Sequence, residues 1–362
     1  MKSLHLGQDG IAPRLLGYRM PAEWEPHEAT WLAWPSNLET WPEHLDSVKD
    51  VWTEMVRLLS PTEKVHLLVD DAEAEAEATK RLKAAGAAMD RVFFHRIPTV
   101  DVWIRDYGPT FITKRGGEDA LAFVDWEFNG WGEKYESYVQ DDSVVKELTR
   151  LVRVPVFEPG IVLEGGSIDV NGLGTCLTTE QCLLNPNRNP HLRRSEIERI
   201  LKDCLGLAHV IWLGEGIVGD DTDGHIDDIA RFVDPTTVVA AVEDDPQDEN
   251  YAALRKNYEQ LQQSTDPEGR RLTVVPLPMP GQVVYKGTRL PASYANFYIA
   301  NGIVLVPTFD HANDRGAVET LTRLFPKRRV IGIPCRALVA GLGAIHCVTQ
   351  QQPAPLFPEI GR

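Results

Sequence analysis

The chain has 362 residues, of which 43% are hydrophobic and 25% charged, and this composition is typical of a globular protein. Its formal net charge of −16 argues against a nucleic-acid partner, because binding to phosphates requires a basic face. The same charge is compatible with a small cationic ligand. No apolar run approaches the length of a membrane span, and the first residues, interrupted by Gly7, Gly10 and Pro13, do not form a secretory signal.

Cysteine usage favours a reducing, cytoplasmic setting. The chain has 5 cysteines, an odd number, and no Cys-x-x-Cys pair. Disulfide frameworks are typical of small secreted domains, and this chain is not small. The cysteines are Cys176, Cys182, Cys204, Cys335 and Cys347.

A strand–helix–strand unit recurs along the chain with little residue identity between copies. The opening strands are predicted at residues 30–34, 120–128, 175–184, 237–242 and 302–307. The helices are predicted at residues 45–59, 142–151, 195–204, 250–263 and 316–325. The closing strands are predicted at residues 64–69, 152–157, 209–213, 272–277 and 330–333. No glycine-rich phosphate loop follows these strands, so a Rossmann-type cofactor fold is poorly supported.

One further short strand is expected before each unit, and these lead strands carry the unusual residues. They are predicted at residues 102–106, 162–168, 224–230, 293–298 and 344–349. The last of them precedes the first unit if the chain closes on itself. Five units with five lead strands predict a single-domain, five-bladed, pseudo-symmetric α/β propeller over residues 1–362, in which residues 1–18 form an N-terminal extension. The lead strands would then line a central channel, where a ligand binds.

Cys347 is the candidate nucleophile. It lies in an apolar segment directly after a glycine-rich turn, Gly341-Leu342-Gly343. Glycines at such a place mark a bend or a close backbone approach. The alternative is a buried structural cysteine, which is the commoner fate of this residue type. The neighbouring His346 is not expected to be the base, because adjacent residues in a strand point to opposite faces.

His225 and Asp227 are two residues apart in a predicted strand, so their side chains share a face. They belong to an acidic run that contains Asp220, Asp221, Asp223, Asp227 and Asp228. One interpretation is a divalent metal site, because carboxylates and histidine are suitable ligands. The other is a cation-binding pocket with a histidine base. We favour the second, with no metal and no cofactor, because no further metal-ligand spacing occurs.

Two more carboxylates and a tryptophan belong to the other lead strands. Glu164 interrupts an apolar strand and either pairs with a cation or lies at a solvated strand end, because glutamate is almost never buried alone. Asp106 is either a ligand-binding group or the local ion-pair partner of Arg105. Trp103 is either a core residue or a flat wall against a planar cation.

Together the thiol, the histidine and the three carboxylates suit one chemistry. Carboxylates hold a guanidinium well, because its fork of N–H donors matches two oxygens. A thiol beside bound positive charge is shifted towards the thiolate. The residues therefore predict nucleophilic attack by Cys347 on a guanidinium carbon.

Five motifs occur in one order over nearly the whole chain. They are Met20-Pro21-Ala22-Glu23-Trp24, Trp103-Ile104-Arg105-Asp106-Tyr107-Gly108-Pro109, Leu163-Glu164-Gly165-Gly166-Ser167-Ile168, Asp223-Gly224-His225-Ile226-Asp227 and Gly343-Ala344-Ile345-His346-Cys347-Val348-Thr349-Gln350. With these motifs the chain resembles the agmatine deiminase and bacterial peptidylarginine deiminase family of the guanidino-group-modifying superfamily. The resemblance implies the pentein fold, a five-bladed α/β propeller, which agrees with the repeats.

The resemblance also implies roles for residues. The implied catalytic set is Cys347 as nucleophile, His225 as general acid and base, Glu164 as the glutamate of the same site, and Asp106 and Asp227 as the guanidinium clamp. Trp103 matches a wall of the substrate channel, and we expect Asp221, with Asp220 and Asp223, to attract a distal amine. Tyr107 departs from the Arg-Asp-Thr-Gly-Pro form of many agmatine enzymes and leaves the substrate open.

The expected reaction is hydrolysis of agmatine to N-carbamoylputrescine and ammonia through a covalent thiouronium on the cysteine. The rivals are a peptidylarginine or other small-guanidine deiminase, an amidinotransferase, a metal-dependent hydrolase and a non-catalytic binding propeller. The expected partner is a small cationic guanidino compound, with no nucleic acid and no membrane. Homo-oligomerisation stays open.

Overall fold

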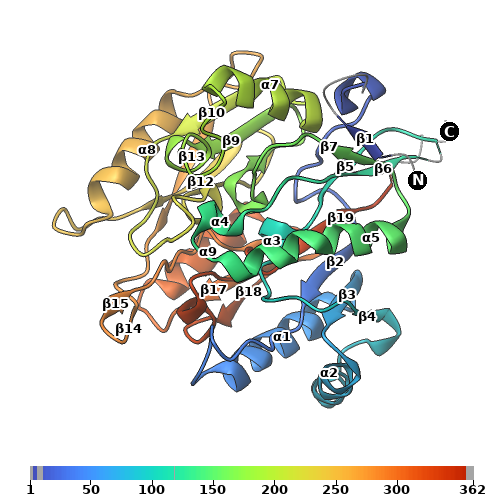
Figure 1. Ribbon diagram of the computed structural model, residues 1–362. Coiled ribbons are helices and arrows are strands. Elements are labelled where there is room, and N and C mark those ends of the chain that lie inside the picture. Colours follow the sequence, from blue (N-terminus) through green and yellow to red (C-terminus); the bar gives the residue numbers. More distant parts are fainter. Residues whose placement is uncertain (1–2, 6–10, 118, 356–362) are drawn as a thin grey trace.

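Five sheets share one three-stranded pattern in the computed structural model, which describes residues 3–5, 11–117 and 119–355 (Figure 1). In each sheet the central strand pairs antiparallel with one neighbour and parallel with the other. The sheets are β19 (Gln350–Pro353)–β2 (His27–Ala33)–β3 (Lys64–Val69), β5 (Thr110–Thr113)–β6 (Leu121–Val124)–β7 (Val156–Glu158), β8 (Asp169–Val170)–β9 (Thr175–Thr179)–β10 (His209–Leu213), β11 (Ala230–Phe232)–β12 (Thr237–Val242)–β13 (Thr273–Pro278) and β16 (Tyr298–Ala300)–β17 (Ile303–Thr308)–β18 (Arg329–Pro334).

Helices join the parallel strands, because such strands need a crossover connection. The longer helices are α1 (Leu45–Leu59), α2 (Ala72–Ala85), α5 (Val144–Val152), α7 (Arg194–Leu205), α8 (Tyr251–Gln263) and α9 (Asp314–Leu324). In α1 the buried residues include Val48, Trp52, Met55 and Leu59, which is the spacing of one helical face. This face packs against the sheet and explains why sequence periodicity predicted the helix with the observed bounds.

Three further pieces complete the described sheets. Strand β4 (Val92–Arg96) extends the first sheet beyond β3, and β1 (Ser3–His5) pairs with β7. Strands β14 (Val284–Tyr285) and β15 (Thr288–Arg289) form a separate hairpin. Part of the predicted N-terminal extension is therefore a sheet strand, while residues 1–2 and 6–10 of it lie outside the described residues.

A strand near the C-terminus joins the sheet of the first unit. Strand β19, near the C-terminus, pairs antiparallel with β2, and Gln350 lies opposite Trp31 (Figure 1). The expectation that the last lead segment precedes the first unit is confirmed. This closure brings the segment that carries Cys347 beside the other lead segments.

The lead strands themselves were predicted wrongly in part. Three of the five contain a single helical turn, namely α3 (Ile104–Tyr107), the 3-10 turn Gly165–Ser167 and the 3-10 turn Ile226–Asp228, and their strands begin only afterwards. The predicted ranges 293–298 and 344–349 are also almost free of strand, because β16 begins at Tyr298 and β19 at Gln350. Short apolar runs do not distinguish a strand from a buried helical turn. The opening strand predicted at 175–184 also ends early, because the Thr179 side chain accepts from Cys182 N and begins a short helix, α6 (Glu180–Leu183).

Two other short helices border the lead segments. They are α4 (Gly130–Glu133) and the 3-10 helix Glu136–Ser143, both between β6 and α5. Further 3-10 turns are Pro13–Leu16, Met89–Arg91 and Leu338–Gly341. Within the described ranges, every helix is too short or too polar to cross a membrane.

Candidate active site

The helical turns of three lead segments meet at Gly166. A Cβ atom at this glycine would lie 2.6 Å from His225 Nδ1, 2.8 Å from Asp106 Oδ1 and 3.1 Å from Asp227 Oδ2. Only a residue without a side chain fits there. The structure thus brings together three of the residues that the sequence analysis selected, and it explains the second glycine after Glu164.

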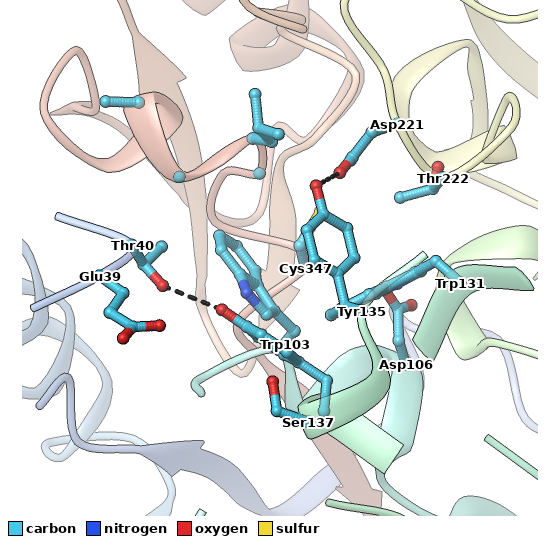
Figure 2. A pocket seen from close by; sticks show the side chains of 15 residues that line it. Glu39, Thr40, Trp103, Asp106, Trp131, Tyr135, Ser137, Asp221, Thr222 and Cys347 are labelled. Carbon is cyan, nitrogen blue, oxygen red and sulfur yellow. Dashed lines mark hydrogen bonds between the residues drawn. The ribbon is translucent and has the colours of Figure 1, made fainter. Parts of the chain in front are cut away.

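A cavity of about 380 Å³ opens beside this point (Figure 2). Cys347 and Asp106 line it together with the aromatic side chains of Trp103, Trp131 and Tyr135. A volume of this size holds a small organic molecule. Trp103 therefore lies where the sequence analysis expected a wall of the substrate channel.

Asp106 is held by two donors. Its Oδ2 accepts a hydrogen bond from Trp131 Nε1 at 2.9 Å, and its Oδ1 accepts one from the backbone N–H of Gly166 at 2.9 Å. Burial raises the pKa of Asp106 to about 6, although nearby His225 acts in the opposite direction. The carboxylate is fixed in position, and its charge is costly unless a cation binds beside it.

Asp227 is fully buried and uses only one of its oxygens. Oδ2 lies 2.7 Å from His346 Nδ1 and 3.7 Å from Cys347 Sγ. Oδ1 has no hydrogen-bond partner within the part of the chain that the structure describes. Burial alone would raise the pKa of Asp227, but the hydrogen bond and charge of His346 hold it below its usual range.

His225 lies between two carboxylates. Its Nδ1 is 3.8 Å from Asp106 Oδ1, and its Nε2 is 3.9 Å from Glu164 Oε2. The other oxygen of Glu164 accepts from Arg188 Nε at 2.7 Å. Burial would lower the pKa of His225, but Asp106, Cys182 and Glu164 together raise it well above its usual value. These neighbours favour the protonated imidazole, which is the form able to donate a proton.

Cys347 is 8% exposed, and its Sγ lies 3.1 Å from Asn296 Nδ2. Burial raises its pKa well above the usual value, and the charges of Asp227, Asp228 and Asp106 raise it further. These carboxylates favour the protonated thiol. A cation placed between these carboxylates would lower the pKa of the thiol.

Of the three acids expected to attract a distal amine, only Asp221 lines the cavity. Its Oδ2 accepts from Tyr135 Oη at 2.5 Å (Figure 2). Asp220 accepts backbone hydrogen bonds from its own loop, and Asp223 pairs with Lys134 and Arg188. The expectation for Asp220 and Asp223 is therefore wrong, because both carboxylates hold the loop instead. Sequence reasoning missed Glu39, which also lines the cavity.

The acidic run around His225 does not gather around a common metal position, because its carboxylates bind separate partners. The one group with metal-ligand spacing among the described residues is Glu164, Cys182 and His225, whose ligand atoms lie within 4.8 Å of one another. Arg188 bonds the other oxygen of Glu164 and opposes a second cation there.

Sequence reasoning missed His346 and Asn296. His346 was set aside on the premise of a strand, yet residues 344–349 precede β19, and both His346 and Cys347 approach Asp227. Asn296 was a polar residue in an otherwise aromatic and apolar run, which was the available signal. Tyr107 does not line the cavity, and its hydroxyl donates to Asp101 O at 2.9 Å.

The fold and the pocket define a mixed α/β protein with a buried thiol among carboxylates, open to a cationic ligand. A sequence profile of the Porphyromonas-type peptidyl-arginine deiminase family matches residues 19–353. The agmatine deiminase of Medicago truncatula is 40% identical over 373 aligned residues, which cover 94% of this chain and 98% of the plant protein. The chain belongs to this deiminase family.

Solved structures agree with this assignment. The agmatine deiminase of Enterococcus faecalis superimposes with a TM-score of 0.88 at 33% identity, covering 96% of this chain and 98% of the other. An amidinotransferase from Microseira wollei, 12% identical, has a TM-score of 0.53 and covers 93% of this chain and 98% of its own, which is a likeness of fold alone.

Proposed function

We propose that this protein is a hydrolase that converts agmatine and water to N-carbamoylputrescine and ammonia. The observation that carries the proposal is the buried Cys347 thiol in a cavity whose charged lining is acidic. Glu39, Asp106 and Asp221 line this cavity, and no lysine, arginine or histidine of the described residues does. Such a pocket attracts a cation and repels a carboxylate, which favours agmatine over free arginine.

In the first half-reaction Asp106 and the unpaired Oδ1 of Asp227 hold the guanidinium. The bound cation offsets the carboxylate charges that raise the pKa of Cys347, so the thiol releases its proton to solvent only when substrate is present. The thiolate attacks the central carbon and forms a C–S bond. His225 then protonates one amino group, which leaves as ammonia and produces the thiouronium.

In the second half-reaction the same histidine acts in reverse. Neutral His225 takes a proton from water, and the hydroxide attacks the thiouronium carbon. The C–S bond breaks, the ureido product leaves, and the hydroxyl proton restores the thiol. The raised pKa of His225 suits the first step, because the imidazole is protonated when the substrate arrives. Glu164 orients the ring and needs no metal for this task.

The similarity to agmatine deiminases of Medicago truncatula and Enterococcus faecalis supports agmatine as substrate. The family profile, named for peptidyl-arginine, supports the peptidylarginine deiminase as the rival. Tyr107 is no longer an argument for either, because it does not line the cavity.

We also propose that the five sheets are the blades of one closed five-bladed propeller, the pentein fold, forming a single domain over residues 1–362. The shared strand pattern and the pairing of β19 with β2 support this architecture. A cytoplasmic location is supported by the cysteines, all five of which are free and buried.

The test compares kcat/KM for agmatine, arginine and an arginyl peptide, with ammonia and ureido product both measured. We expect agmatine to be the preferred substrate by at least a factor of ten. Acid quenching during turnover, followed by mass spectrometry, should show the thiouronium on the peptide that contains Cys347. A preference for the arginyl peptide would assign the rival activity, and ureido product without any adduct would contradict the covalent route.

A further inference from the structure

Three buried side chains, Glu23, His346 and Asp227, form a hydrogen-bonded row that ends beside the thiol. The mechanism above uses only Asp227. His346 Nε2 lies 2.8 Å from Glu23 Oε2, and His346 Nδ1 lies 2.7 Å from Asp227 Oδ2. None of the three side chains is more than 7% exposed. Both ring nitrogens thus face a carboxylate oxygen at hydrogen-bonding distance. Two such bonds require both nitrogens to carry hydrogen, which is the imidazolium form.

Two arginines hold Glu23, the member of this row that lies farthest from the thiol. Arg231, fully buried, has its NH2 group 2.9 Å from Glu23 Oε2, and Arg105 has its NH2 group 3.6 Å from the same oxygen. Burial alone would raise the pKa of Glu23, but Arg231 and His346 hold it well below the usual range. These contacts favour the ionised form of Glu23, which also accepts a hydrogen bond from the backbone N–H of Ile299 at 2.7 Å.

His346 sets the positions of two groups of the active site, the Asp227 carboxylate and the Cys347 thiol. His346 directly precedes Cys347, and its backbone N–H donates to Asn296 Oδ1 at 2.9 Å. The bond from its ring to Asp227 Oδ2 therefore fixes the carboxylate relative to the thiol. With Oδ2 occupied in this way, the unpaired Oδ1 is the oxygen left for a ligand.

We propose that His346 is a positioning residue, a cation fixed between Glu23 and Asp227 that keeps the Asp227 carboxylate ionised and its Oδ1 directed at the guanidinium. The inference rests on the proposed function, because it concerns the same carboxylate clamp. It assigns a role to a residue that touches neither the substrate carbon nor the leaving group. Other charged or titratable groups around Asp227 are His225, Arg105, Arg231, Cys347, Asp106 and Asp228.

Two isosteric substitutions separate the parts of this role. In His346→Asn the side-chain amide N–H can occupy the place of Nδ1 and still donate to Asp227, although the charge is lost. In His346→Gln the amide reaches the place of Nε2, and Asp227 loses its donor. A charge-assisted hydrogen bond corresponds to roughly tenfold to a hundredfold in an equilibrium, so we expect kcat/KM for agmatine to fall about tenfold in the first variant and about a hundredfold or more in the second.

The pH profile distinguishes positioning from mere packing. On a Cys347→Ser background, where the thiol cannot titrate, Asp106 is the carboxylate of the clamp expected to titrate near pH 6, so the acid limb of agmatine affinity has a one-proton slope. Loss of the His346 charge removes the largest of the groups that lower the pKa of Asp227, so the pKa of this buried carboxyl rises. The acid limb of His346→Asn should therefore steepen towards a two-proton slope and move to higher pH. Glu23→Gln, which weakens the anion that holds the imidazolium, should shift the limb in the same direction by less.

The matched control is His191→Asn and His191→Gln, at an exposed position before α7. Both control variants should keep the wild-type rate and slope, and thermal melts should verify folding of all variants. If wild-type protein deiminates no guanidino compound, the proposed function fails. If the wild type is active but the two His346 variants lose the same activity, or the acid limb of His346→Asn and Glu23→Gln stays unchanged, the positioning role is overturned.

Discussion

Gly166 lies against His225 so closely that a Cβ atom there would stand 2.6 Å from the imidazole Nδ1. The same atom would be 2.8 Å from Asp106 Oδ1, and neither side chain is free to retreat, because both are buried. The pocket therefore requires glycine at position 166, because only a residue without a side chain lets His225 and Asp106 lie this close to the backbone and to one another.

Gly166→Ala should therefore lower kcat/KM by about a hundredfold or more, because a displacement of about 1 Å at such groups has that effect on rate. Steady-state kinetics on agmatine measure the loss. Gly316→Ala is the matched control: a Cβ atom there meets nothing within 4 Å, and α9 gains a better helix former. The control should keep full activity and a slightly raised Tm. Equal activity of the two variants would contradict the site geometry.

Cys347→Ser should abolish turnover while the protein stays folded, because a hydroxyl is a far weaker nucleophile than a thiolate. Initial rates and circular dichroism measure the two properties. Cys204→Ala, on the buried face of α7, is the control and should keep most activity, because Cys204 packs in the hydrophobic core and does not line the cavity. If Cys347→Ser retained more than a few per cent of wild-type activity, another residue would have to be the nucleophile.

Asp227→Asn should weaken substrate binding about tenfold to a hundredfold, because a charge-assisted hydrogen bond to a cation is worth ~1.5–3 kcal/mol. Turnover should fall further, since the guanidinium must be held in line with the thiolate. Asp106→Asn should behave alike. The exposed Asp244→Asn is the control and should be silent. Calorimetric titration on a Cys347→Ser background separates binding from turnover, and normal binding by the Asp227 variant would remove the clamp from the proposal.

Substrate affinity should be lost as the pH falls through about 6. The pKa of Asp106 is raised to about 6 by burial, and only the ionised carboxylate attracts a guanidinium. KM should therefore rise about tenfold for each pH unit below 6, while remaining flat between 7 and 8. A KM independent of pH down to 5 would mean that Asp106 does not carry the charge that binds substrate.

Dialysis against a strong chelator should leave the rate unchanged, because the charges of Asp106 and Asp227 are met by the substrate. Cys182→Ala provides the independent check. Among the described residues, Cys182, Glu164 and His225 are the group whose ligand atoms lie close enough together to hold a metal ion. This variant should retain activity within a few-fold of wild type. Loss of activity after dialysis, restored by Zn²⁺ or Mn²⁺ in the wild type but not in the variant, would favour a metallohydrolase.

The sequence by itself determined the repeated strand–helix–strand units. Helix α1 at Leu45–Leu59, strand β3 at Lys64–Val69 and strand β12 at Thr237–Val242 have the predicted bounds. Apolar periodicity is a local property, so a single segment contains all of its evidence. The residues around Cys347 selected it as the candidate nucleophile, and the motif resemblance implied the same role.

Only the tertiary structure decided which polar groups meet. It turned the motif segments into helical turns, left Asp221 rather than Asp220 or Asp223 in the cavity, and joined His346 to Asp227. These contacts connect residues far apart in the chain, and a side chain's neighbours are fixed by how the sheets assemble. Local patterns of hydrophobicity specify which helices and strands form. The orientation of a buried charged side chain depends instead on hydrogen-bond and ion-pair partners that other elements contribute.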